Sequence, residues 1–100
     1  MAKSNFSELI KGQIPTLIDF SAEWCGPCKM MKPILDQVKA TMGDQVRVIK
    51  IDVDKNPSIA SSYQVRGVPT LILFKTGEIK WRQSGVVPTE NLTKIIREHL

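Results

Sequence analysis

The chain has 100 residues, of which 42% are hydrophobic and 24% charged, and its formal net charge is +4. This composition predicts one folded domain over residues 1–100 and excludes a membrane-spanning helix, because no apolar run approaches the roughly 20 residues that such a helix needs. The basic residues are scattered along the chain rather than gathered in one patch, which argues against nucleic-acid binding.

The first predicted elements are a short helix and a buried strand. Residues 5–11 are predicted to be helical, with Asn5 and Glu8 as a capping pair and Gly12 as the stop signal. Residues 16–20 follow a proline and read Thr-Leu-Ile-Asp-Phe. A mostly apolar, β-prone run of this length is typical of a buried strand.

A longer helix is predicted to follow Cys25 and to end near Thr41, with Gly43 after it and a kink at Pro33. One side of this helix carries apolar residues at helical spacing. They are Met31, Leu35, Val38 and Met42.

The second half of the chain contains two predicted strands separated by a short helix. The strands are residues 46–51 and 70–74, and the second is continuously apolar, as in a strand covered on both faces. Asn56 is predicted as the N-cap of the short helix, with Pro57 at its first position and an end near Tyr63.

A hairpin and a last helix close the chain. The turn at residues 75–77 leads into residues 78–84, where apolar and charged residues alternate as in a strand with one wetter face. Pro88 is predicted to open the final helix. Its expected buried side is Leu92, Ile95, Ile96 and His99 or Leu100.

The order α-β-α-β-α-β-β-α implies crossover connections and a parallel portion, followed by a closing antiparallel strand. It therefore predicts an α/β fold whose central mixed four-stranded sheet carries helices on both faces.

Cys25 and Cys28 are the only cysteines, and they stand where a predicted strand passes into a helix. Residues three apart in a first helical turn have Cα atoms roughly 5–6 Å apart, within the range of a disulfide. Because a disulfide between such close residues closes almost no loop, the pair indicates redox chemistry rather than a structural cross-link. The helix N-terminus stabilises a Cys25 thiolate, which is the attacking species in disulfide exchange. Pro27 fixes the first turn, and Gly26 leaves room for a substrate backbone.

Two other interpretations of the pair are a zinc half-site and an inert buried pair. Zinc takes about four ligands, whereas this chain offers two cysteines and one distant histidine, His99. A zinc site would therefore need partner molecules, and no metal or cofactor is expected beyond the redox-active Cys25–Cys28 disulfide.

Several motifs carry a resemblance to one family. Residues 17–30, LIDFSAEWCGPCKM, resemble the active-site segment of bacterial thioredoxins. Residues 66–71, RGVPTL, resemble the family's cis-proline loop, Gly85 matches the glycine after its last strand, and residues 52–57 match in kind and position. The similarity extends over nearly the whole chain from Phe6 onward, and it implies the thioredoxin fold.

The resemblance also implies a role for each matching residue. Cys25 would attack a substrate disulfide to form a mixed disulfide, and Cys28 would resolve it. Asp19 matches a buried aspartate that assists proton transfer to and from Cys28, and Lys50 matches a lysine near that aspartate. The surface that docks the substrate chain would comprise Trp24, Gly26, Pro27, Gly67, Val68, Pro69 and Gly85.

Physical arguments support some of these roles and leave others to the resemblance. Burial would raise the pKa of Asp19 towards neutrality, which suits a general base, although the pattern alone equally allows a solvent-facing Asp19. Most strand lysines face solvent, so Lys50 would act on Asp19 only electrostatically. The cis form of the bond before Pro69 rests on the family, because an X-Pro bond is cis in about one case in twenty. Trp81 is expected to pack on the hairpin rather than to join the site.

Two features depart from the family pattern. Only about four residues precede the first predicted helix, so the family's first strand is expected to be short or missing. Ser21 stands where bacterial thioredoxins usually carry a tryptophan. A smaller polar residue there would let more water near Asp19 and loosen the packing behind the site.

The favoured function is a cytoplasmic protein-disulfide reductase, recharged, as the resemblance implies, by thioredoxin reductase, an NADPH-dependent flavoprotein. The expected partners are this enzyme and disulfide-containing proteins, with no nucleic acid and no membrane, and the protein is expected to be a monomer. A disulfide oxidant or isomerase is a second possibility, but such proteins usually carry histidine where Gly26-Pro27 stands. A binding module with incidental cysteines is the third.

Overall fold

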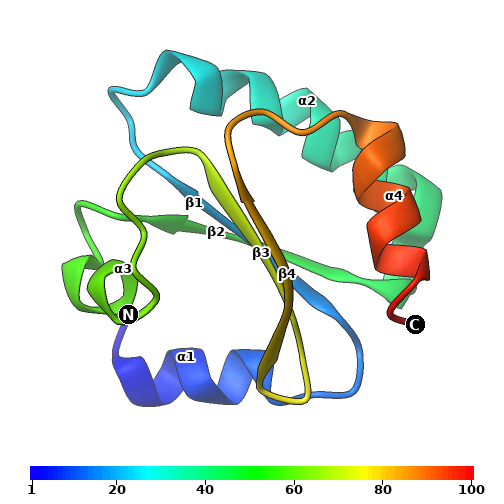
Figure 1. The fold of residues 1–100 in the computed structure, drawn as a ribbon, viewed down its shortest axis with the longest axis horizontal. Helices are drawn as coiled ribbons and strands as arrows, with labels where there is room; N and C mark the ends of the chain where they lie inside the picture. The colour runs from blue at the N-terminus through cyan, green and yellow to red at the C-terminus, as the bar shows by residue number, and fades with distance from the viewer.

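A four-stranded mixed sheet forms the centre of the computed structural model, which describes residues 1–100 (Figure 1). The strands are β1 (Thr16–Ser21), β2 (Arg47–Asp52), β3 (Thr70–Lys75) and β4 (Glu78–Ser84). Their order is β2-β1-β3-β4, with β1 parallel to β2 and antiparallel to β3, and β3 antiparallel to β4. The helices are α1 (Lys3–Ile10), α2 (Gly26–Met42), α3 (Pro57–Ser62) and α4 (Thr89–Arg97), with a short 3-10 turn η1 (Gly43–Gln45). The predicted fold class and order of elements are confirmed, with ends that differ by one or two residues.

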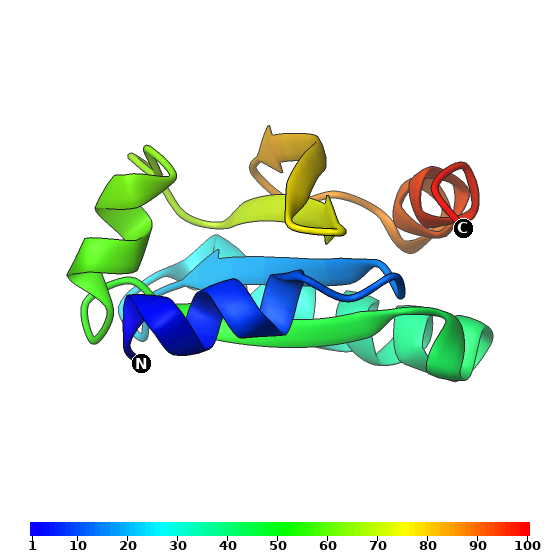
Figure 2. The same ribbon diagram turned by 90° about the horizontal axis from the view of Figure 1, so that it is seen from below.

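The helices form two layers, with α2 and α4 on one face of the sheet and α1 and α3 on the other (Figures 1 and 2). Strand β1 supplies side chains to both layers in alternation. Leu17 packs into the core under α2 and α4, whereas Ile18 and Phe20 pack into the core with α1 and α3. Asp19 and Ser21 share the side of Leu17. Asp19 therefore faces α2, the helix that carries the cysteines.

Helix α2 follows the sequence prediction closely. Its apolar stripe from Met31 to Met42 is buried, and it ends at Gly43, whose φ of +55° is one that glycine tolerates best. Pro33 lies inside the helix. None of the helices combines the length and apolar character needed to span a bilayer.

The predicted cap of α1 is wrong, whereas the predicted N-cap position of α3 is confirmed. Helix α1 begins at Lys3 without a side-chain cap, so Asn5 and Glu8 do not form the expected pair. Burial of its apolar face against the sheet accounts for this helix instead. Asn56 is the N-cap residue of α3 with Pro57 in the first turn, as predicted, but its side chain makes no cap bond; its amide group donates to the Asp52 carbonyl at 3.0 Å.

The last helix starts after Pro88, at Thr89, and its buried side is Leu92, Thr93 and Ile96. Ile95 and His99 are half-buried, whereas Leu100, the alternative to His99, is 51% exposed at the end of the chain. Trp81 packs against the α2–α4 core, as predicted.

The sheet begins with β1, and no strand precedes α1. This agrees with the expectation that the family's first strand is short or missing here. Strand β2 consequently forms one edge of the sheet and β4 the other.

Candidate redox-active site

Cys25 and Cys28 form a disulfide at the start of α2, with their Cα atoms 5.3 Å apart. Cys25 is the N-cap residue, in an extended conformation, and Pro27 stands in the first helical turn. The backbone N–H of Cys28 donates to the Cys25 Sγ at 3.1 Å. The same N–H and the helix N-terminus would stabilise negative charge on this sulfur once the disulfide opens.

The loop before β3 lies against the cysteine pair. The Val68 carbonyl oxygen is 3.6 Å from the Cys25 Sγ, and the Val68–Pro69 peptide bond is cis, as the resemblance implied. Two hydrogen bonds hold this loop to its surroundings: the Gly85 N–H donates to the Pro69 carbonyl at 2.8 Å, and the Thr70 hydroxyl donates to the Gly67 carbonyl at 2.6 Å. The loop therefore presents backbone groups beside the reactive sulfur.

An exposed rim surrounds the buried sulfurs. The Trp24 side chain is 72% exposed, and its Nε1 donates to the Asp54 carboxylate at 2.8 Å. A Cβ added at Gly26 or Gly67 would meet nothing within 4 Å, so both positions border open space. Of the seven predicted docking residues, only Pro69 is buried.

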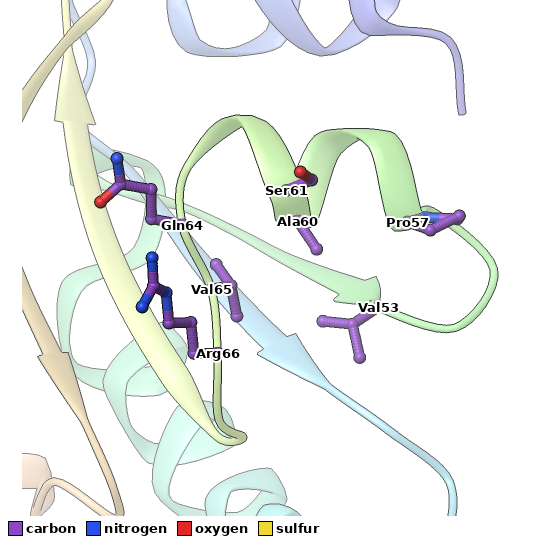
Figure 3. A pocket seen from close by; sticks show the side chains of 7 residues that line it. All are labelled: Val53, Pro57, Ala60, Ser61, Gln64, Val65 and Arg66. Carbon is purple, nitrogen blue, oxygen red and sulfur yellow. The ribbon is translucent and has the colours of Figure 1, made fainter.

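A cleft of about 390 Å³ that the sequence did not indicate lies next to Val53 (Figure 3). Figure 3 shows Val53, Ala60 and Val65 converging on it from the end of β2, from α3 and from the segment before β3. Val53 also packs against the cluster formed by the two cysteines and Ala22. The remaining lining residues are Pro57, Ser61, Gln64 and Arg66. No pattern in the sequence indicates this cleft, because its lining comes from separate segments.

Asp19 is buried on β1, with only 2% of its surface exposed, so the predicted burial is confirmed. Burial raises the pKa of its carboxyl from 3.8 to about 6, and the positive charge of Lys50 opposes part of this rise. Lys50 lies directly opposite Asp19 in the β1–β2 register. A carboxyl group with such a pKa can exchange protons near neutral pH.

A cavity of about 240 Å³ connects Asp19 with the second cysteine. Asp19, Cys28 and Lys50 line it together with Lys32, Leu35, Asp36 and Val48. The structure thus brings together all four residues predicted to take part in the chemistry, since Cys25 is bonded to Cys28.

The chain holds no group of three or more His, Cys, Asp or Glu side chains placed to bind a metal ion. His99 lies at the end of the last helix, where its Nδ1 is 2.8 Å from the Ile95 carbonyl oxygen.

A CxxC disulfide at a helix N-terminus, facing a cis-proline loop above a mixed sheet, defines a thiol–disulfide oxidoreductase of the thioredoxin fold. The family model described as thioredoxin matches residues 1–98. The chain therefore belongs to the thioredoxin family.

Individual relatives agree with this assignment. The chain is 43% identical over 93 residues to Thioredoxin 1 of Synechococcus elongatus, covering 93% of this chain and 87% of that protein. It is 43% identical over 97 residues to a thioredoxin of Staphylococcus saprophyticus, covering 97% of this chain and 92% of that protein. The oxidized form of mitochondrial thioredoxin 3 from Saccharomyces cerevisiae superposes with a TM-score of 0.85 at 42% identity, over 95% of this chain and 88% of that one. The predicted activity, protein-disulfide reduction by a thiol–disulfide oxidoreductase, is confirmed.

Proposed function

We propose that Cys25 is the attacking cysteine and Cys28 the resolving one in the reduction of protein disulfides. The observation that carries this division is the difference in their neighbours. The Cys25 Sγ accepts a hydrogen bond from the backbone N–H of Cys28 at the helix N-terminus and lies beside the exposed rim. Cys28, in contrast, lines the cavity with Asp19. Their exposed fractions, 3% and 6%, do not distinguish them.

The reaction proceeds in two exchanges. The Cys25 thiolate attacks one sulfur of the substrate disulfide, forming a mixed disulfide and releasing the other substrate sulfur as a thiolate, which takes a proton from solvent. Cys28 then gives its proton to the Asp19 carboxylate and attacks the Cys25 sulfur. The Cys25–Cys28 bond forms, the bond from Cys25 to the substrate breaks, and the second substrate thiolate leaves with the electron pair. Lys50 keeps part of the Asp19 population charged and so able to accept that proton.

The reductase, cellular location and oligomeric state of the protein are proposed from its family assignment. An NADPH-dependent thioredoxin reductase reduces the Cys25–Cys28 disulfide again after each turnover. The protein works in the cytoplasm as a monomeric domain, without a metal or other cofactor. Nucleic acid and membranes are not among its partners.

The reduction potential of the Cys25–Cys28 pair tests the direction of electron flow. We expect a value near about −270 mV, measured by equilibration in graded thiol–disulfide buffers with thiol trapping at each point. A value near about −180 or −120 mV would instead identify an isomerase or oxidant. Absence of any reversible two-electron transition would favour the third alternative, a binding module whose cysteines are incidental.

The cleft next to Val53 is proposed to hold the substrate polypeptide beyond its disulfide, because Val53 lies in contact with both the cysteine cluster and the cleft. Ser61 is exposed at this cleft, so Ser61→Arg would fill it without disturbing the core. We expect KM for a protein substrate to rise about tenfold with little change in kcat. Reduction of a small aromatic disulfide, which does not reach the cleft, should be unchanged.

Ser58→Arg is the matched control, because Ser58 is exposed on the same helix and does not line the cleft. Equal effects of the two arginines on KM, or a loss for the small disulfide as well, would refute the docking role of the cleft.

A further inference from the structure

The segment between α3 and β3, residues 63–69, borders both the cleft and the reactive sulfur (Figure 3). Its residues that line the cleft are Gln64, Val65 and Arg66. Further along the same segment, the Val68 carbonyl oxygen lies 3.6 Å from the Cys25 Sγ. Because one stretch of backbone serves both places, any contact that fixes its course also fixes the position of the cleft relative to the disulfide.

The first part of this segment is a turn that its own residues do not favour. Gln64 has a φ of +55°, in the left-handed region that residues other than glycine seldom adopt. Such a conformation persists only where the surrounding structure holds it. The Gln64 N–H donates to the Ser61 carbonyl at 3.0 Å, and the N–H of the next residue donates to the Ala60 carbonyl at 2.9 Å. Both bonds use N–H groups and leave the carbonyl groups of the turn available to donors outside it.

Arg82 of β4 supplies such donors. Its Nη1 donates to the Tyr63 carbonyl at 2.7 Å, and its Nη2 donates to the Gln64 carbonyl at 3.5 Å. Arg82 lies opposite Ile72 in the β3–β4 register, and Ile72 packs into the core with α1 and α3. The arginine therefore leaves β4 on the face that α3 covers. A guanidinium group suits this contact, because its neighbouring N–H groups can engage two successive carbonyls and its positive charge is favourable at a helix C-terminus.

The other end of the segment is also held from β4. The Gly85 N–H, directly after the strand, donates to the Pro69 carbonyl at 2.8 Å. No other side chain of the protein donates to the two carbonyls of the turn that Arg82 engages. One strand thus holds residues 63–69 at both ends, and Arg82 is its contact at the end nearer the cleft.

We propose that Arg82 is a positioning residue for substrate binding: its guanidinium group fixes the turn at residues 63 and 64 and thereby holds the cleft in place beside the Cys25 sulfur. This inference rests on the docking role proposed above for the cleft. Arg82 does not line the cleft, so it acts through the backbone that it holds and not by touching the substrate. It takes no part in the two exchanges, and a substrate too small to reach the cleft does not depend on it.

The test is Arg82→Met, which keeps an unbranched side chain and removes both donors. We expect KM for a protein substrate to rise about fivefold, because a turn that is released part of the time presents the cleft less often. We expect kcat to stay within about twofold of the parent value. Reduction of the small aromatic disulfide 5,5′-dithiobis(2-nitrobenzoate) should be unchanged. Arg82→Lys, which keeps a charged donor for one carbonyl, should recover most of the lost affinity.

Hydrogen exchange followed by NMR measures the turn directly. In Arg82→Met, the backbone N–H groups of Gln64 and Val65 should exchange about fivefold faster than in the parent. The N–H groups of β3 should keep the exchange rates of the parent. A merely structural role of Arg82 would lower the stability of the whole domain, and exchange in β3 would then rise as well.

Arg47→Met is the matched control. Arg47 is also an exposed strand arginine, and its Nη1 also donates to a backbone carbonyl, that of Leu9, at 3.4 Å. This variant removes the same charge and a bond of the same kind, but it leaves the turn untouched. We expect KM and the exchange of Gln64 and Val65 to stay at the parent values. Equal rises of KM in the two variants would assign the effect to charge alone and overturn the proposal.

The docking role of the cleft and the role of Arg82 fail differently. If Ser61→Arg leaves KM for the protein substrate unchanged, the cleft does not dock the substrate, and this inference falls with it. If Ser61→Arg raises KM and Arg82→Met does not, only the role of Arg82 is wrong. If both raise KM, Arg82→Met should add little in a Ser61→Arg background, where the cleft is already filled. A full additional rise in the double variant would contradict the proposal.

Discussion

Replacing Cys25 by serine is expected to abolish protein-disulfide reduction, lowering turnover by on the order of a thousandfold or more. A serine hydroxyl stays protonated even at a helix N-terminus, and an S–O bond is not a disulfide, so neither exchange can occur. Turnover of a protein substrate in the presence of a dithiol reductant measures the loss. Because the Cys25–Cys28 disulfide closes so short a loop, the variant should fold like the reduced parent.

The contrasting variant, Cys28→Ser, separates the two roles. It should attack a substrate disulfide once and then stop, leaving a stable mixed disulfide between Cys25 and the substrate that mass spectrometry detects. Cys25→Ser should leave no such adduct. If Cys25→Ser trapped the substrate and Cys28→Ser did not, the assignment of attacking and resolving cysteines would be reversed.

The parts of the structure that the sequence predicted are those in which a local pattern and the tertiary packing agree. The apolar stripe of α2 predicts a helix that buries this one side. The continuous apolar run of β3 predicts a strand covered on both faces, and both arrangements occur in the structure. The cysteine pair is equally local, because a separation of three residues at a helix start suffices to bring the sulfurs together.

The orientation of Asp19 could not be predicted from pattern alone, because every residue of β1 is buried. A strand covered on both faces has no polar side that would reveal the direction of a carboxylate. The packing of Leu17 against α2 and α4, and the cavity that Asp19 shares with Cys28, show that Asp19 faces the cysteines. The direction of the Ser21 side chain could not be predicted for the same reason, although the sequence did mark Ser21 as a departure from the family.

The prediction of the cap of α1 is wrong for another reason. Asn5 and Glu8 have the spacing of a capping box, but the burial of Phe6 and Ile10 against the sheet allows the helix to begin two residues earlier. Tertiary contacts outweigh a cap, which is worth about 1 kcal/mol.

Replacing Asp19 by alanine is expected to stabilise the oxidised protein at alkaline pH while slowing the resolution of the mixed disulfide. Burial raises the pKa of Asp19 from 3.8 to about 6, so the folded state binds this proton more tightly than the unfolded state does. The free energy of unfolding therefore falls as the pH rises between about 4 and 7, and the charged carboxylate costs about 3 kcal/mol above that range. Asp19→Ala removes this cost, so it should raise the free energy of unfolding by about 2 kcal/mol at pH 8, after allowance for the small cavity it leaves. Below about pH 4 the gain should disappear.

Urea unfolding of the oxidised protein at pH 4 and pH 8 measures both ends of this range. Asp44→Ala is the control, because Asp44 is an exposed carboxylate in the turn after α2 and forms no ion pair. It should leave the pH dependence of stability unchanged. A stability gain of Asp19→Ala that was equal at pH 4 and pH 8 would contradict the assignment of the cost to a buried charge. A gain confined to alkaline pH, in a variant that also resolves mixed disulfides slowly, would show that the buried charge destabilises the fold and serves the proton transfer at Cys28.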